Sequence, residues 1–165
     1  MKFGRYLHTS NSIFLFLIIF LSGCATNGMR EMSCGFGFDL RYNDQHSAVL
    51  DYRLLGENSV ISMAQKVLVD QGHKFYFEGI AYQFERPTSL YVKWKNDQTG
   101  STFEDTVDLR QVLPRNLEDT NLYFIVHGAQ LFVYLALKEK YVQGSPRVGG
   151  DYAARTNIQL YPKVN

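Results

Sequence analysis

The sequence predicts a mainly β protein, an antiparallel β-sandwich or barrel-like single domain with one short helix. From residue 35 onward, most apolar runs are short, rich in aromatic and β-branched residues, and alternate with polar residues. Turn residues separate seven or eight such runs. Hydrophobic residues make up 45% of the chain and aromatic residues 15%, which is enough for a sizeable core.

Residues 1–23 are predicted to be a signal peptide. Lys2 and Arg5 precede an unbroken apolar run from Ile13 to Leu21, which is about half the length that a membrane-spanning helix needs. The run ends in Leu21-Ser22-Gly23-Cys24, which resembles the lipobox of bacterial lipoproteins. In that family a signal peptidase cuts before the cysteine, which then carries acyl chains such as palmitate. The resemblance implies a lipoprotein anchored through Cys24.

Residues 24–33 are predicted to be a polar tether, and residues 34–165 a single β-rich domain. Cleavage before Cys24 would leave 142 of the 165 residues, a common size for one domain. More than one acyl chain is sufficient for stable anchoring. Ala25 follows the cysteine, where an Asp tends to retain lipoproteins in the inner membrane. The resemblance therefore implies the periplasmic face of the outer membrane.

Charge and cysteine content narrow the expected partners. Without Lys2 and Arg5, 15 basic side chains face 16 acidic ones, and no basic patch is expected, so nucleic acid is not a predicted partner. If Cys24 is acylated, Cys34 has no cysteine left to pair with inside the chain. Cys34 is predicted to be a small buried hydrophobe, with an intermolecular disulfide or a reactive thiol as the alternatives.

The first predicted strand covers residues 35–42, where Phe36, Phe38, Leu40 and Tyr42 alternate with polar or small residues. Residues 43–45 are turn formers, and residues 48–54 are predicted to be the return strand. Residues 59–70 form the one expected helix, because Val60, Met63, Ala64, Val67 and Leu68 share a face, with Asn58 or Ser59 as its cap. A strand is the alternative there, because residues 67–69 favour β-structure.

The rest of the chain is predicted to be strands and turns. Residues 74–84 are aromatic and extended, with Gly79 as a possible bulge. Two hairpins follow, one with strands 90–95 and 102–109 around a loop at 96–100, and one with strands 121–126 and 131–137 around residues 127–130. Residues 144–150 form a glycine-rich loop, and residues 158–161 add a last strand.

No catalytic constellation is expected, so the chain is predicted not to be an enzyme and to need no metal or cofactor. His46, His73 and His127 lack the spacing of a helical metal site, and no G-x-S-x-G motif surrounds Ser145. Glu104 and Asp105 would point to opposite faces of a strand, so they form no acid–base pair. An envelope enzyme remains an alternative, and it would depend on one of those histidines or on Ser145.

Binding residues are expected on two loops, because recognition is concentrated in loops on rigid β scaffolds. The segment after residue 144 displays Arg147, Asp151, Tyr152 and Arg155, and the 95–101 hairpin displays Lys95 and Asp97. Tyrosine and arginine are the residue types enriched at binding hot spots. A sheet face with an unusual share of tyrosines is a further candidate, unless another layer covers it: Tyr76, Tyr82, Tyr91 and Tyr134.

Residues 91–100, 107–110, Leu113-Pro114 and 132–135 resemble a group of small bacterial lipoproteins. Some members of that group are similar to immunity proteins against lipase effectors of type VI secretion. The resemblance implies a periplasm-facing binding protein that occludes a toxic lipase effector, with a protein and the membrane as partners. The alternative is an envelope structural or assembly lipoprotein.

Overall fold

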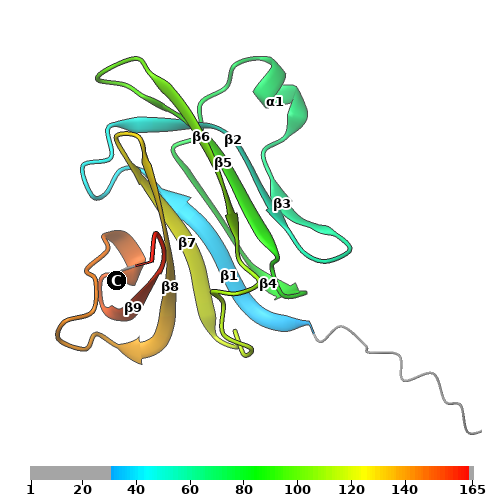
Figure 1. Ribbon diagram of the computed structural model, residues 1–165, viewed down its shortest axis with the longest axis vertical. Coiled ribbons are helices and arrows are strands. Elements are labelled where there is room, and N and C mark those ends of the chain that lie inside the picture. The colour runs from blue at the N-terminus through cyan, green and yellow to red at the C-terminus, as the bar shows by residue number, and fades with distance from the viewer. Residues whose placement is uncertain (1–30, 164–165) are drawn as a thin grey trace, which may run out of the picture.

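Two β-sheets pack face to face in the computed structural model, which describes residues 31–163 (Figure 1). The five-stranded sheet has the order β4-β1-β7-β8-β9, and the four-stranded sheet has the order β3-β2-β5-β6. Neither sheet closes into a barrel, so the predicted β-sandwich is confirmed. The elements are β1 (Met32–Asp39), β2 (Ser47–Leu55), β3 (Val60–Met63), α1 (Lys66–Asp70), β4 (Phe77–Phe84), β5 (Ser89–Asn96), β6 (Thr102–Asp108), β7 (Thr120–His127), β8 (Gln130–Lys140), the 3₁₀-helix η2 (Gly150–Tyr152) and β9 (Arg155–Tyr161).

The predicted turn at residues 43–45 is present, but it connects strands of different sheets. β1 pairs with β4 and β7, whereas β2 pairs with β3 and β5. Asn43, Asp44 and His46 all adopt positive φ, which tightens the reversal. The expectation that residues 48–54 return beside the first strand was therefore wrong, because turn residues determine the reversal and not the sheet that receives the next strand.

The helix predicted over residues 59–70 was wrong in its first half. Residues 60–63 form β3, in which Ile61 is buried and the backbone pairs with β2. The helical part is limited to the five residues of α1, whose N-cap Gln65 makes no side-chain capping hydrogen bond. Pairing with β2 outweighs the helical spacing of these apolar residues, as tertiary context often does. Among the described residues, no helix has the length and apolar character needed to cross a membrane.

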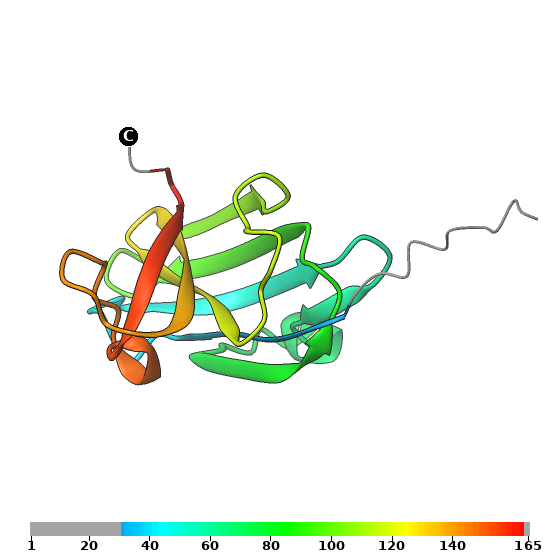
Figure 2. The same cartoon turned by 90° about the horizontal axis from the view of Figure 1, so that it is seen from below.

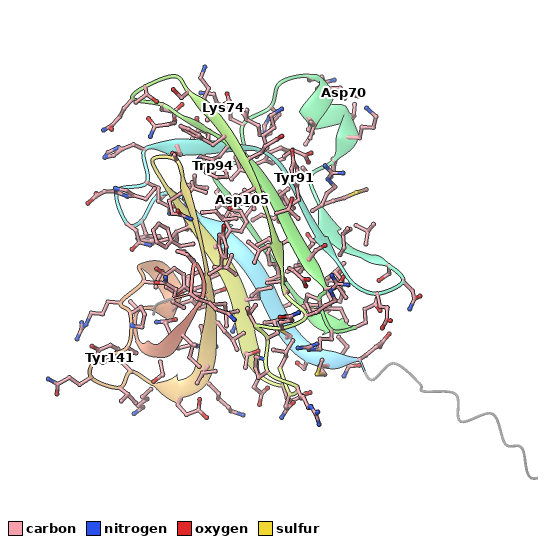
Figure 3. All side chains as sticks on the ribbon, in the orientation of Figure 1. Asp70, Lys74, Tyr91, Trp94, Asp105 and Tyr141 are labelled. Atoms are coloured by element: carbon pink, nitrogen blue, oxygen red, sulfur yellow. The ribbon has the colours of Figure 1, made fainter. Side chains whose placement is uncertain are left out.

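The core lies between the sheets and contains three of the four alternating residues of the first predicted strand, whereas the fourth, Tyr42, is exposed. Phe36, Phe38 and Leu40 are buried on the β1 side, and Leu90, Val92 and Trp94 are buried on the β5 side. Trp94 Nε1 donates to the Gly128 carbonyl oxygen at 2.9 Å, which joins β5 to the β7–β8 turn (Figure 3). This bond gives the indole N–H the partner that a buried polar group requires.

The outer face of the five-stranded sheet is covered over only part of its width. Residues 146–152 lie over β7 and β8, where Tyr123 stacks on Tyr134 at 5.4 Å and on Tyr152 at 4.7 Å. Val148 is buried in this second cluster. β1 and β4 instead present small residues on this face, with Gly37 opposite Gly79 and Gly35 opposite Ala81. The register is regular across Gly79, so the predicted bulge there was wrong.

The chain enters the sandwich at β1, seen in blue at the right of Figure 2, far from β9 in red at the left. β1 begins at Met32, inside the segment predicted as tether, and Met32 is buried. The predicted signal peptide and Cys24 lie outside the described residues. Cys34 is buried in β1, as the small-hydrophobe prediction requires, and its burial raises the pKa of the thiol.

Candidate functional site

An aromatic cleft of about 270 Å³ opens on the outer face of the five-stranded sheet. Tyr42, Phe77 and Tyr152 contribute to its walls, and Tyr123 and Gly79 to its floor. It lies at the C-terminal end of β1, whereas the chain enters at the N-terminal end. β1 has eight residues, so the cleft is about 25 Å from the point of entry. We call these five residues the aromatic cleft.

Strand periodicity brings the cleft residues to one face. Asp39 is opposite Phe77 in the β1–β4 register, and Gly37 is opposite Gly79 on one side and Tyr123 on the other. Residues two apart on a strand share a face, so these side chains point away from the core. The two glycines leave the floor low, and Phe77 stands 62% exposed above it.

An ion pair closes one rim of the cleft. The Arg41 guanidinium donates to both Asp39 carboxylate oxygens, at 2.8 and 2.6 Å, and its central carbon lies 4.8 Å from the centre of the Phe77 ring. The hydrogen bonds from Arg41 hold the pKa of Asp39 below its usual value. The rim is thus internally neutralised and the walls are aromatic, which suits an uncharged side chain of a protein partner.

Hydrogen bonds between loops fix the cleft before any partner binds. The Gly149 N–H donates to Asn43 Oδ1 at 2.9 Å, and the buried Gln45 joins β1 to β7 by accepting from the Val126 N–H at 2.8 Å and donating to the Asp39 carbonyl oxygen. A Cβ at Gly149 would lie 2.6 Å from the Tyr42 Cβ, so only glycine allows this close approach. Such preorganisation reduces the entropic cost of binding.

Of the six predicted binding residues, only Tyr152 lines the aromatic cleft. Arg147 lies outside it, with its guanidinium carbon 4.4 Å from the centre of the Tyr141 ring. Asp151 belongs to η2, and its side chain is not among those described. Arg155 lines a separate hollow of about 330 Å³, and its Nη1 is buried without a hydrogen-bond partner.

Lys95 and Asp97 lie at the β5–β6 hairpin. Asp97 Oδ1 accepts from Lys74 Nζ at 3.0 Å, and the Asp97 N–H donates to the His46 carbonyl oxygen at 2.8 Å. Figure 3 shows Lys74 at the top and Tyr141 at the lower left, so the partners of Asp97 and Arg147 lie well apart. The six residues therefore do not form one continuous site.

The residues weighed for catalysis are dispersed. His46, His73 and His127 are exposed, and the His73 ring packs edge-on against Phe75 at 4.9 Å. Ser145 Oγ donates to the Val142 carbonyl oxygen, and Glu104 accepts from the Tyr91 hydroxyl. Within residues 31–163, no group of three or more His, Cys, Asp or Glu side chains has the arrangement of a metal site.

Tyr42, Phe77 and Tyr123 were not predicted to be site residues from the sequence. Tyr42 continues the alternation of β1, but it lies beyond the end of the strand and is 44% exposed. Tyr123 was assigned to a strand without a role, and it is buried beside Tyr134 and Tyr152. Its burial raises the pKa of its hydroxyl, which stays neutral. The high aromatic content of the chain, 15%, was the available signal.

Comparison with known proteins identifies no relative. No protein-family model matches the chain, and neither a curated protein nor a solved structure matches it.

Proposed function

We propose that this protein is a lipid-anchored, periplasm-facing binding protein, and specifically an immunity protein that neutralises a lipase-type toxic effector by steric occlusion. The lipobox at residues 21–24 supports the anchor, and the lipoprotein resemblance over roughly residues 91–162 supports the immunity role. In this proposal the protein acts on the outer membrane, facing the periplasm.

The observation that carries the proposal is the position and rigidity of the aromatic cleft. It lies at the far end of β1 from the predicted tether, so a partner arriving from the periplasm reaches it without contacting the membrane. Its walls combine tyrosine and phenylalanine, which supply large contact areas at low entropic cost. A preformed surface of this kind binds a folded partner with little rearrangement.

The test is a pull-down from the lysate of the producing organism with residues 25–165. This fragment retains every described strand and the whole core. We expect one protein in stoichiometric amount, and we expect its phospholipid-hydrolysing activity to fall when the purified fragment is added. Recovery of envelope-assembly components instead would favour the structural alternative, and a captured lipase that remains fully active would contradict the immunity role.

A matched pair of variants assigns the binding to the cleft. Phe77→Ser removes an exposed cleft wall, and Ile158→Ser removes an exposed apolar side chain on β9 outside the cleft. We expect Phe77→Ser to weaken binding of the captured protein by at least about tenfold. We expect Ile158→Ser to leave binding unchanged. Equal effects of the two variants would exclude the cleft as the binding site.

A further inference from the structure

β4 is a terminal strand whose outer edge has no partner among the described strands. It pairs with β1 on one side only. The Gly79 N–H donates to the side chain of its own neighbour, Glu78 Oε1, at 3.1 Å, so it points away from β1. Because backbone groups alternate along a strand, those of Phe77, Ala81 and Gln83 also point outward. This row of N–H and C=O groups is a template for another strand.

The β4 edge carries little charge to oppose the addition of another strand. Its eight residues include one charged side chain, Glu78, and no lysine, arginine or proline. A Cβ at Gly79 would meet nothing within 4 Å, and its φ is unexceptional, so neither space nor backbone geometry requires glycine there. A glycine inside a strand often marks the close approach of another backbone.

Exposed apolar side chains are concentrated in the segment that contains β3, α1 and β4. Nine large hydrophobic side chains are exposed among the described residues, and six of them come from residues 60–82. A hollow of about 450 Å³ separates β3 from β4, with Val60, Ile61 and Tyr82 in its lining. The six are Val60, Met63, Val67, Tyr76, Phe77 and Tyr82.

We propose that a second copy of this chain covers the edge by antiparallel pairing of β4 with β4 across a twofold axis at Ile80. In this register Gly79 exchanges hydrogen bonds with Ala81 of the second copy, and Phe77 does so with Gln83. Ile80 faces Ile80. The two five-stranded sheets become one continuous ten-stranded sheet.

Charge favours this occupant and this register. Glu78, the only charged residue of β4, lies opposite Tyr82 of the second copy and not opposite another carboxylate. The two Glu78 side chains are four positions apart, about 13 Å.

The symmetry has a consequence for the aromatic cleft. A twofold axis perpendicular to the sheet turns both outer faces in the same direction. The dimer would therefore present two clefts on one surface. The pairing itself does not depend on the proposed immunity function, because it uses the backbone edge of β4.

Cysteine cross-linking in the full chain tests the register. In an antiparallel pair without hydrogen bonds between the facing residues, the Cα atoms are about 4.5 Å apart, which a disulfide can bridge. We expect Ile80→Cys in envelope preparations treated with a mild oxidant to yield mainly a disulfide-linked dimer. Glu104→Cys, exposed on β6, and the unmodified chain should remain monomeric on a non-reducing gel.

A second pair of cysteine variants tests whether the register is specific. We expect Glu78→Cys and Tyr82→Cys to cross-link when the two variants are produced together, and neither to cross-link alone. If Ile80→Cys cross-links no more than Glu104→Cys, or couples to a different polypeptide, the proposal is wrong.

Proline substitution tests whether the pairing needs the outward backbone N–H groups of β4. Ala81→Pro removes an outward N–H, which an edge strand tolerates, and we expect it to lower Ile80→Cys dimer formation about tenfold or more. Thr106→Pro is the matched control, because the Thr106 N–H on β6 also points outward, to Asp105 Oδ1 at 2.7 Å. Thermal unfolding identifies any variant that fails to fold. Equal dimer formation in a folded Ala81→Pro variant would overturn the proposal.

Discussion

The two edges of the sandwich are built alike and differ in charge. On each edge a tyrosine hydroxyl joins the two sheets: Tyr82 of β4 donates to the Ile61 carbonyl oxygen of β3 at 2.5 Å, and Tyr161 of β9 donates to Asp105 Oδ2 of β6 at 2.9 Å. β6 carries three acidic residues in seven, whereas β4 carries one in eight.

This difference in charge indicates which feature leaves an edge open to another strand. β4 and β6 both cap an outward N–H with the carboxylate of the preceding residue, Glu78 or Asp105. Only β6 adds further carboxylates, which repel a second copy of the same strand. Acidic residues therefore protect β6, whereas β4 remains available for pairing.

The largest loss of stability is expected from a substitution in the core, on which both edges depend. Phe124 is fully buried and stacks on Phe38 with ring centres 4.7 Å apart. We expect Phe124→Ala to lower the free energy of unfolding by about 3–5 kcal/mol. Phe77→Ala, at an exposed position, should change it by about 0.5 kcal/mol or less. Urea unfolding measures both, and similar losses would mean that Phe77 is part of the core.

Removing acidic charge from β6 should make this edge strand resemble β4. Glu104→Gln combined with Asp108→Asn removes two carboxylates and leaves the Tyr161–Asp105 bond intact. We expect assemblies larger than a dimer, because both edges of each copy would then accept a strand. Light scattering measures the increase, and Lys93→Gln on the neighbouring β5 controls for a simple change in surface polarity. An unchanged particle size would show that these acids do not protect the edge.

The two bridging tyrosines should differ in energy. We expect Tyr161→Phe to lower the free energy of unfolding by about 1–2 kcal/mol, because its hydroxyl donates to a charged acceptor. Tyr82→Phe loses a bond to a neutral carbonyl and should cost about 0.5–1 kcal/mol. Chemical denaturation of the two variants in parallel provides the comparison. A larger loss for Tyr82→Phe would reverse the assignment of the stronger bridge.

The smallest expected effect concerns alkaline pH. The hydrogen bond to Asp105 raises the pKa of Tyr161 above its ordinary value. A raised pKa means that the neutral hydroxyl stabilises the fold below about pH 10 and that this contribution is lost as the pH rises through the folded-state pKa. We expect Tyr161→Phe to lose less stability than the unmodified chain between about pH 9 and 11. An equal loss of stability with rising pH in the two proteins would contradict a contribution from Tyr161.

Local patterns predicted most of the strands but not their assignment to sheets. The 90–109 hairpin was predicted correctly because alternation and turn residues lie within a few positions of each other. The separation of β1 from β2, and the parallel pairing of β1 with β7, depend on contacts between distant residues. The helix error at residues 59–70 arose because short apolar runs fit both periods.

The candidate site was less predictable than the fold. Tyr152 was identified because it lies in a conspicuous loop, but Tyr42, Phe77 and Tyr123 come from three segments that only the β1–β4 and β1–β7 pairings bring together. The loop residues Arg147 and Arg155 were expected on one surface, yet they lie in different surroundings because Val148 and Tyr152 pack the loop onto the sheet. No local pattern encodes that packing.

The most direct test of the edge comparison is the molar mass of residues 25–165 by sedimentation velocity, measured beside Ala81→Lys and Thr106→Lys. A lysine on β4 supplies the protection that this edge lacks. We expect twice the monomer mass for the unmodified fragment and for Thr106→Lys, and the monomer mass for Ala81→Lys. A monomer in all three, or a dimer that Ala81→Lys does not disrupt, would contradict this expectation.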